Sequence, residues 1–399
     1  MLKFLTAGES HGPQLTAILD GLPAGLRLDP EQIDIQLARR QQGYGRGGRM
    51  KIENDRVKIL SGVRHSVTLG SAITLVIENK DWANWKRIMA PVAPLPKKLS
   101  EREKPRALET SCPRPGHADL AGGIKYNHHD LRNVLERASA RETAARVAIG
   151  ALCRQLLEHF NVRFASHVVQ IGTVKLAQRA RPTDLTALYE AAEKSQVRCI
   201  DPSTSARMVA AIKSAKKERD SLGGAVEVIV RGLPAGLGGF SQWTDRLDGR
   251  LAQAMMAIQS VKAVEIGAGA KLSGKRGSQA HDEIFLEAGT QSPRKGFVRR
   301  TNRAGGLEGG ITNGEDIIIR VAAKPLSTLN RPLRSVDVRT RQPRAAMVER
   351  ADTCVVPALA VVCEAAAAFI LADAFLTKFG SDNLAETLHN YDSFLAAEY

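Results

Sequence analysis

Gly21-Leu22-Pro23-Ala24-Gly25-Leu26 is a hexapeptide that recurs unchanged as Gly232-Leu233-Pro234-Ala235-Gly236-Leu237, an offset of 211 positions. The segments before the two copies, residues 14–20 and 225–231, alternate apolar and polar residues as β-strands do, and each runs into its Gly/Pro turn. A helical pattern follows each copy: Asp29-Pro30 is a typical helix start, and residues 245–258 carry the second pattern. Chance recurrence of a common turn is the alternative, but six identical residues in matching context favour duplication.

The duplication predicts one domain over residues 1–399, made of two similar halves (about 8–200 and 220–380) that share a core. We expect further strands at residues 57–62, 72–78, 168–174 and 316–322, and helices at residues 130–160 and 357–378. Strands in hairpin-like pairs before helices predict an α+β fold in which helices pack between antiparallel sheets, a β-α-β sandwich. Residues 82–107, rich in Pro, Lys and Arg, predict a surface loop or lid.

The chain is strongly basic. Its 399 residues have a formal charge of +15, with 43% hydrophobic and 25% charged residues, so a sizeable core is possible. A basic surface attracts nucleic acid, acidic membranes or small phosphates and carboxylates. RNA-binding proteins interleave aromatic residues with basic runs, but aromatics are only 5% here, and Tyr44 alone lies in the Arg/Gly-rich segment 39–49. We therefore expect a small anionic ligand and no nucleic acid.

The cysteines and the apolar runs indicate the compartment. Five scattered cysteines without a Cys-x-x-Cys pair argue against a disulfide framework or a structural zinc site and favour a reducing cytosol. The apolar part of residues 1–7 is too short for a signal peptide. The longest apolar run, residues 355–376, contains Glu364 and Asp373, which are costly in lipid. The sequence thus predicts a soluble, cytoplasmic protein with a buried helix and no membrane partner.

Gly8-Glu9-Ser10-His11-Gly12 is the first of four motifs that carry chemistry. Its two glycines let the backbone approach a ligand closely. A Ser beside a His suggests nucleophilic catalysis, but the sequence places no acid to orient the His. The other interpretations are a Gly-rich turn with an exposed His, or a His that acts as general acid toward a phosphate leaving group near neutral pH.

Arg39-Arg40 lead into a segment that contains Arg46, Arg49 and four glycines. Forked guanidinium donors suit phosphate and carboxylate, and glycines expose backbone N–H groups. The segment could instead contact RNA or be a solvated loop. One short copy between ordered elements favours a small-anion site.

Pro115-Gly116-His117-Ala118-Asp119 is a turn whose His could be structural, or a metal ligand if further ligands joined it; we expect no metal. Arg137-Ala138-Ser139-Ala140-Arg141-Glu142-Thr143 places Arg137 and Arg141 four apart on one helical face, with alanines that leave room for a flat ligand. A solvated helix face is the alternative there. In Arg350-Ala351-Asp352-Thr353-Cys354, the Asp could simply cap the helix that follows.

Two later segments offer contacts to a planar or phosphorylated ligand. Gly305-Gly306-Leu307-Glu308-Gly309-Gly310 can pass close to a ring or a phosphate. Lys324-Pro325-Leu326-Ser327-Thr328 presents an ammonium group and two hydroxyls, which suit a flavin phosphate or ribityl chain, with a capped turn as the alternative. No Gly-x-Gly-x-x-Gly follows a strand and opens a helix, so a Rossmann site, and with it a flavin or NADPH oxidoreductase, is unsupported.

The four motifs, in this order, resemble those of the chorismate synthases, and the resemblance runs from Gly8 to about Lys378. It implies an anti-1,4 elimination of phosphate from 5-enolpyruvylshikimate 3-phosphate that gives chorismate in the shikimate pathway. It also implies reduced FMN as cofactor without net redox change, NADPH as a possible reductant, and a homotetramer. Because the ring hydrogen is unactivated, a cofactor has to carry this chemistry. A substrate of about four negative charges and a phosphorylated flavin account for the basic charge.

The resemblance also assigns roles to individual residues. His11 would protonate the leaving phosphate with Ser10 beside it, His117 would protonate or stabilise the reduced flavin, and Asp352 would assist proton transfer at the flavin's reactive nitrogen. Ser139 would also be catalytic. Substrate or NADP would be held by Arg40, Arg46, Arg49 and Arg141. The FMN site would be formed by Arg137, Ala138, Ser139, Gln259, Ser260, Gly309, Lys324, Pro325, Leu326, Ser327, Thr328 and Arg350.

Overall fold

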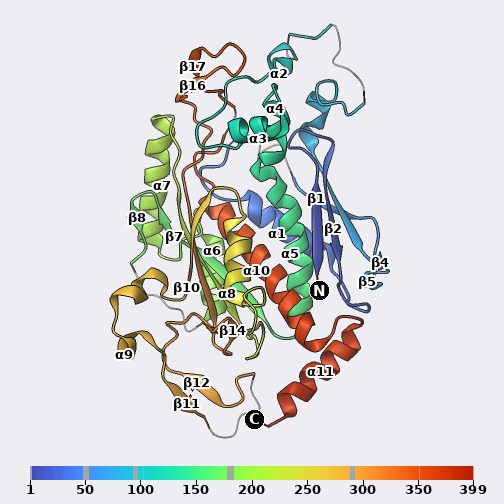
Figure 1. The fold of residues 1–399 in the computed structure, drawn as a ribbon, viewed down its shortest axis with the longest axis vertical. Coiled ribbons are helices and arrows are strands. Elements are labelled where there is room, and N and C mark those ends of the chain that lie inside the picture. Colours follow the sequence, from blue (N-terminus) through green and yellow to red (C-terminus); the bar gives the residue numbers. More distant parts are fainter. Residues whose placement is uncertain are drawn as a thin grey trace.

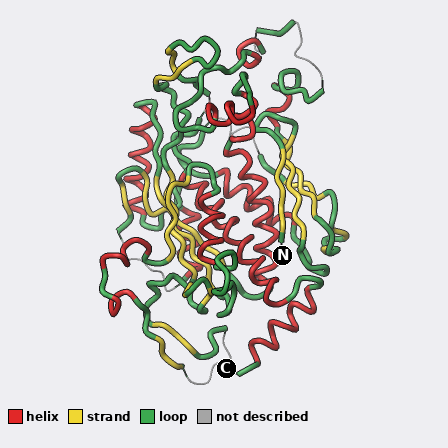
Figure 2. Tube along the Cα trace, viewed as in Figure 1, coloured by secondary structure: helices red, strands yellow, loops and turns green. Residues whose placement is uncertain are grey.

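The structure is a computed structural model that describes residues 2–47, 54–92, 98–101, 103–177, 184–287, 293–349 and 351–398. Helices occupy the middle of the molecule, and an antiparallel sheet lies on each side of them (Figure 1). The same arrangement is visible in Figure 2 as red helices flanked by yellow strands. This mixture of helices and antiparallel sheets agrees with the α+β prediction.

The first sheet has four strands in the order β1-β2-β6-β3, with bounds Lys3–Ala7, Gln14–Asp20, Ile73–Glu78 and Val57–Ile59. The second sheet has five strands in the order β10-β15-β9-β7-β8, with bounds Val261–Ile266, Ile317–Ala323, Gly224–Arg231, Arg163–Ile171 and Val174–Lys175. All neighbours in both sheets run antiparallel. Four two-stranded hairpins complete the described strands: β4–β5 (Val63–Arg64, Val67–Thr68), β11–β12 (Ile284–Leu286, Phe297–Arg299), β13–β14 (Leu307–Glu308, Ile311–Thr312) and β16–β17 (Arg334–Val336, Pro343–Ala345).

Four helices form the group between the sheets: α1 (Pro30–Gln41), α5 (Thr143–Glu158), α8 (Leu247–Met256) and α10 (Val356–Phe379). The other helices are α2 (Lys104–Ala107), α3 (Asp119–Tyr126), α4 (Arg132–Ala138), α6 (Leu185–Lys194), α7 (Pro202–Lys217), α9 (Gly277–Ala280) and α11 (Leu384–Ala396). The described residues also form the short 3₁₀ helices η2 (Lys80–Asn84), η3 (Ala140–Glu142) and η4 (Gly269–Gly274).

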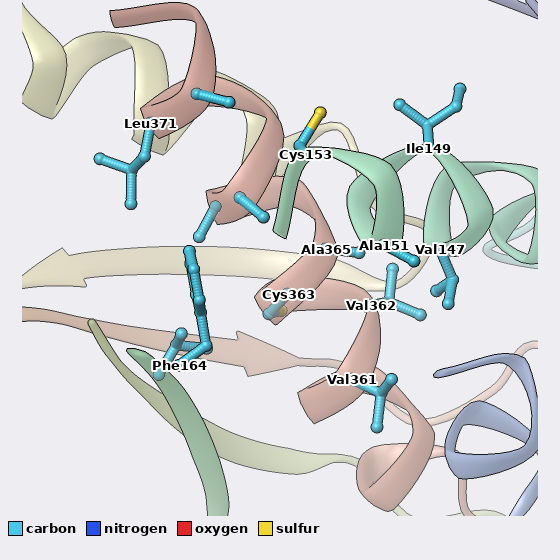
Figure 3. Packing of buried hydrophobic residues seen from close by; sticks show 14 of the residues in the cluster. Val147, Ile149, Ala151, Cys153, Phe164, Val361, Val362, Cys363, Ala365 and Leu371 are labelled. Atoms are coloured by element: carbon cyan, nitrogen blue, oxygen red, sulfur yellow. The ribbon is translucent and has the colours of Figure 1, made fainter. Parts of the chain in front are cut away.

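The centre of the core is the contact between α5 and α10. Helix α5 also contacts β2 and β6 of the first sheet, and α10 contacts β7 and β9 of the second, so the two helices join the two sheets. Figure 3 shows Val147 and Ala151 of α5 close to Val362 and Ala365 of α10, with Phe164 of β7 beside α10. Burying these side chains removes apolar surface from water, which is the main stabilising contribution to such a core.

Helix α10 is long and apolar enough to cross a membrane by length and composition, but most of it is buried inside the fold. Its two acids are partnered there: Glu364 lies among Arg39, Arg154 and Arg198, and Asp373 pairs with Arg250. The helix ends where Gly380 caps it, at the glycine that the sequence indicates. These contacts are those of a core helix whose charged groups are paired within the protein.

The repeated hexapeptide has the same conformation and the same partners in both copies. Its first and fifth residues are glycines with positive φ, 94° and 86° in residues 21–26 and 96° and 93° in residues 232–237. A threonine hydroxyl, from Thr68 or Thr312, donates to the carbonyl of the third residue (2.6 Å in both) and accepts from the amide of the sixth (2.9 and 2.8 Å). Each threonine also makes two backbone hydrogen bonds to its hexapeptide. Strands β2 and β9 precede the copies, as the sequence predicts.

The single helix predicted at residues 130–160 is wrong. The chain forms α4, leaves helical geometry at Ser139 (φ −65°, ψ 142°), makes the turn η3 and then continues as α5. Ser139 ends α4 and caps η3, because its hydroxyl accepts from the amide of Arg141 at 3.2 Å. Serine favours such local bonds over helical ones. The apolar periodicity continues through the break, so it gives no sign of it.

Residues 82–107 are more structured than the predicted surface loop. Their described part contains the end of η2 and the helix α2, and Trp85 is only 4% exposed.

Two further predictions concern the ends of elements. The strand predicted at residues 168–174 begins earlier, at Arg163. The predicted N-cap of α1 is present, since the Asp29 side chain accepts from the amide of Glu31 at 2.9 Å.

Gly150 makes the close approach of α5 and α10 possible. A Cβ added there would lie 2.4 Å from Cβ and 2.5 Å from Cα of Ala365, so the Gly150→Ala variant has to separate the helices. We expect the free energy of unfolding, measured by urea denaturation, to fall by about 1–3 kcal/mol. Gly249→Ala in α8 is the matched control, because nothing lies within 4 Å of its added Cβ. That variant should gain up to about 1 kcal/mol from helix propensity, and equal effects of the two substitutions would contradict the packing argument.

Candidate active site

The motifs meet at one cavity of about 590 Å³, called here the site cavity. Its walls come from the loop after β1, the break between α4 and α5, the turn before α3, the segment after β15 and the segment before α10. Twelve residues predicted from the sequence line it: Ser10, His11, His117, Ala138, Ser139, Gln259, Ser260, Lys324, Leu326, Ser327, Thr328 and Asp352. The fold thus brings together residues from position 10 to position 352, which are up to 342 positions apart in the chain.

A second pocket of about 180 Å³, the arginine pocket, adjoins the first. It is lined by Arg40, Arg46 and Arg141, and it shares Ser139, Gln259 and Asp352 with the site cavity. The two spaces therefore have a common wall, and a ligand in one can reach side chains of the other.

His11 is held by a buried carboxylate that the sequence did not suggest. Glu136 of α4 accepts from the His11 backbone N–H (2.8 Å) and lies 2.9 and 3.0 Å from ring Nδ1. Burial alone would raise the pKa of Glu136, but the bonds from His11 and the charge of Arg132 outweigh it and hold that pKa below its ordinary value. Glu136 is therefore anionic at neutral pH. The sequence marks Glu136 only as a charged residue next to Leu135, which lies on the apolar stripe of the helix predicted at residues 130–160.

Trp85 covers one face of the His11 ring. The two rings stack with centroids 4.1 Å apart and planes at 28°. The guanidinium carbons of Arg106 and Arg132 lie 5.5 and 5.2 Å from the Trp85 ring centroid, within the range of cation–π attraction. All four residues line the site cavity, so the segment predicted as a lid contributes an aromatic wall to it.

The break at Ser139 joins two motifs. Its hydroxyl donates to the hydroxyl of Ser10 at 3.2 Å, and the Ser10 backbone N–H donates to the carbonyl of Glu136 at 2.9 Å. Asn79, at the end of β6, donates to the carbonyls of Glu9 and Gly12 and accepts from Arg141. The loop of residues 8–12 is thus fixed from both sides, and Asn79 had no signal in the sequence.

His117 belongs to a four-residue network. Its Nδ1 lies 2.6 Å from Oδ1 of Asp119, which also accepts from Arg114 at 2.8 and 3.0 Å, and Arg114 donates to Thr328 at 2.7 Å. Burial would raise the pKa of Asp119, but the bonds from His117 and Arg114 outweigh it and hold that pKa well below its usual range. Asp119 thus stays anionic and orients the His117 ring. Among the described residues, no group of three His, Cys, Asp or Glu could hold a metal ion.

Lys324 and Ser327 border the same wall. Both donate to the carbonyl of Gly116, and Nζ of Lys324 lies 3.2 Å from the Ser327 hydroxyl. Burial and the charge of Lys262 lower the pKa of Lys324. A bound anionic group next to Lys324 would stabilise its charged ammonium form and so offset the lowering of its pKa.

Three guanidinium groups and the carboxylate of Asp352 line the arginine pocket, and Asp55 pairs with two of the arginines. Arg141 donates to buried Asp55 at 2.7 and 2.6 Å, Arg40 lies 3.5 Å from the same carboxylate, and Arg46 pairs with Asp352 at 2.9 Å. Burial and the charges of Arg141 and Arg46 lower the pKa of Arg40 to about 9, although Asp55 raises it. Bound anions would offset this repulsion, so the pocket is suited to phosphate or carboxylate.

Asp352 is not a helix cap, because α10 begins after Val355 and the Asp352 carboxylate instead binds Arg46 and the backbone N–H of Gly47 (2.5 Å). Gln259 donates to Glu142 at 3.3 Å, while its buried Oε1 has no partner among the described residues. This orphaned acceptor in the wall of both spaces fits a ligand with an N–H or O–H donor, such as a flavin ring.

Several predicted residues lie elsewhere. Arg137 and Arg141 do not share a helical face, which corrects the prediction: the break turns Arg137 outward, where it donates to Thr6 and to the Gly8 carbonyl (2.8 and 3.2 Å). Gly309, at the turn between β13 and β14, and Pro325 do not line either space. Arg49 and Arg350 lie outside the described residues.

Comparisons with known proteins identify the family of this chain. The family model described as chorismate synthase matches residues 2–376. The chain is 52% identical over 397 residues to the chorismate synthase of Geobacter metallireducens, covering 99% of this chain and 98% of that one. It is 54% identical over 396 residues to that of Symbiobacterium thermophilum, with the same coverage. A crystal structure of chorismate synthase superposes with a TM-score of 0.77 at 42% identity, over 99% of this chain and 97% of that one. The chain belongs to the chorismate synthase family, the carbon–oxygen lyases that form chorismate in the shikimate pathway.

Proposed function

We propose that this chain removes phosphate and a ring hydrogen from 5-enolpyruvylshikimate 3-phosphate by anti-1,4 elimination, with reduced FMN as the flavin and no net redox change. The single observation that carries the proposal is the convergence of His11 with Glu136, His117 with Asp119, and the arginine pocket on two adjoining spaces.

The substrate's carboxylates and phosphate are assigned to the arginines. Arg40, Arg46 and Arg141 face the arginine pocket, and we include Arg49 because it lies in the same Arg/Gly-rich segment. Asp55 holds Arg141 and Asp352 holds Arg46 before any ligand arrives. The side chains are thus ordered in advance, which reduces the entropic cost of binding a charged substrate.

The flavin is assigned to the walls around Gln259 and Lys324. Ala138, Ser139, Gln259, Ser260 and the segment from Lys324 to Thr328 would hold it, together with Arg137, Gly309 and Arg350. The chemistry that a bound reduced flavin would supply is a transient electron for the substrate, without net redox change. The ammonium of Lys324 and the hydroxyls of Ser327 and Thr328 suit its phosphate or ribityl chain.

Proton movements are assigned to His11, His117 and Asp352. His11 donates a proton to the leaving phosphate, and the hydroxyls of Ser10 and Ser139 lie beside it. His117, oriented by Asp119, stabilises negative charge on the flavin side of the cavity. Asp352, held between Arg46 and Gly47, assists proton transfer at the flavin. Trp85, which is buried and stacked on His11, limits the access of water to this side chain, which strengthens these interactions.

The test is an anaerobic assay with photoreduced FMN and 5-enolpyruvylshikimate 3-phosphate that follows chorismate and free phosphate together. Equal appearance of both products, and none with oxidised FMN, is expected. Neither product from folded protein that binds reduced FMN would overturn the assignment. A third reaction, with oxidised FMN and NADPH, asks whether NADPH is the reductant: product would mean that the chain reduces its own flavin, and its absence would point to an external reductase.

We also propose that the two halves arose by duplication, at about residues 8–200 and 220–380, and form a β-α-β sandwich in a single domain of residues 1–399. The matched hydrogen bonds of the two hexapeptides support this. A cytoplasmic location is supported by five unpaired, buried cysteines. The homotetramer inferred from the family resemblance is testable by light scattering after gel filtration.

A further inference from the structure

Glu136 is a buried carboxylate to which the proposed mechanism gives no role. Its side chain is fully buried in α4, yet it accepts two hydrogen bonds from a single residue of the site, His11. A buried charge is retained at a cost in desolvation, so a specific function for it is worth seeking.

The carboxylate of Glu136 determines which ring nitrogen of His11 bears the N–H group that points into the protein. An ionised carboxylate only accepts hydrogen bonds, so Nδ1 of His11 has to donate to it. The remaining ring nitrogen, Nε2, is then the one through which His11 exchanges a proton with a substrate.

Neighbouring groups fix the ring in this orientation. Trp85 stacks on one face at 4.1 Å, and the His11 backbone N–H is bound to the same carboxylate as its ring. Arg132, one turn before Glu136, lies 3.4 Å from the carboxylate and 5.2 Å from the centroid of Trp85. A simple charge pair between Glu136 and Arg132 is the rival explanation, but its distance exceeds the 2.8–3.0 Å of the three contacts with His11.

We infer that Glu136 is the positioning residue of His11: its carboxylate holds Nδ1 so that Nε2 serves as the proton donor to the leaving phosphate, an inference that rests on the proposed function of His11. Glu136 lines neither the site cavity nor the arginine pocket, so it acts through the imidazole.

The test uses four variants of the full chain: Glu136→Gln, Glu136→Asp, His11→Ala and the His11→Ala/Glu136→Gln double variant. The amide of Gln is neutral, and it can present N–H to Nδ1 and so favour the wrong tautomer. We expect Glu136→Gln to lower kcat about 10- to 100-fold with KM and flavin Kd within about twofold. Glu136→Asp keeps the charge and should recover part of kcat.

The double variant shows whether Glu136 works through His11. If it does, the double variant is no slower than His11→Ala alone, because the imidazole that Glu136 positions is already absent. If kcat of the double variant instead falls by the product of the two single losses, Glu136 has an independent, structural effect, and the inference is overturned. If Glu136→Gln does not fold, as judged by thermal melting, the same measurements on Glu136→Asp against wild type decide.

Glu9→Gln is the matched control, since it removes an exposed carboxylate two residues from His11 and should leave kcat and KM unchanged. A wild-type kcat in Glu136→Gln, alongside a slow His11→Ala, would refute the positioning role alone. Wild-type turnover in His11→Ala would instead refute the proposed acid role of His11, whatever the Glu136 variants do.

Discussion

Replacement of His11 by alanine is expected to lower the rate of phosphate release about 10²- to 10⁴-fold, the usual contribution of a general acid. The leaving phosphate must be protonated as the carbon–oxygen bond breaks, and His11 lines the site cavity with its ring fixed between Glu136 and Trp85. Flavin binding should stay near the wild-type value, because Lys324, Ser327 and Thr328, which are assigned to the flavin phosphate or ribityl chain, lie on another wall. Stopped-flow measurement of phosphate and chorismate under anaerobic conditions, with a separate flavin titration, checks both parts.

His159→Ala is the control for this substitution. His159 is exposed at the end of α5, away from the cavity, so its loss should leave turnover unchanged. Unchanged turnover in His11→Ala would remove His11 from the chemistry. A loss of flavin affinity as large as the loss of rate would mean that His11 shapes the cavity and does not act as an acid.

Replacement of Glu364 by glutamine is expected to lower the free energy of unfolding by about 3–5 kcal/mol, the usual effect of removing one partner of a buried ion pair. Glu364, 2% exposed in α10, accepts from Arg39 and Arg154 at 2.8 and 2.9 Å and from Ser166 at 2.5 Å. The amide has the same shape but no charge, so the buried guanidinium of Arg39 would keep only Glu193 as an anionic partner. Urea denaturation at neutral pH measures the difference.

The pH dependence of this loss follows from the pKa of Glu364. Burial would raise that pKa, but the charges of Arg39, Arg154 and Arg198 outweigh it and hold it well below its ordinary value. A carboxyl group with a depressed folded-state pKa stabilises the fold fully above its unfolded pKa, about 4.3, and loses this contribution as pH falls toward the folded value. The difference between wild type and Glu364→Gln should therefore be constant above about pH 5.5 and shrink below pH 4.

Glu158→Gln is the matched control. Glu158 pairs with Arg154 at 3.1 Å in α5, but its side chain is 38% exposed, so its loss should cost less than about 1 kcal/mol. If the two substitutions lower the free energy of unfolding by similar amounts, burial does not determine how much the Glu364 ion pairs stabilise the fold.

Local sequence determined several of the regular elements and the identity of the family. The hexapeptides need positive φ at their glycines, and short-range chemistry of this kind can be identified without knowledge of the fold. Helix α10 and strands β2 and β9 appear where periodicity places them, and the motifs themselves identify the family. Most of the predicted site residues also lie together at the two adjoining spaces.

Tertiary structure alone decided where the helix at residues 130–160 breaks and which carboxylates serve the site. The apolar stripe runs through Ser139 without interruption, and the bond to Ser10 that accompanies the break joins residues 129 positions apart. Glu136, Asp55 and Asn79 resemble ordinary polar residues in the sequence, because their partners are distant in the chain. Trp85 acquires its place beside His11 in the same way. Periodicity and capping act over a few residues, whereas burial and pairing of charge depend on contacts that exist only once the two halves have packed.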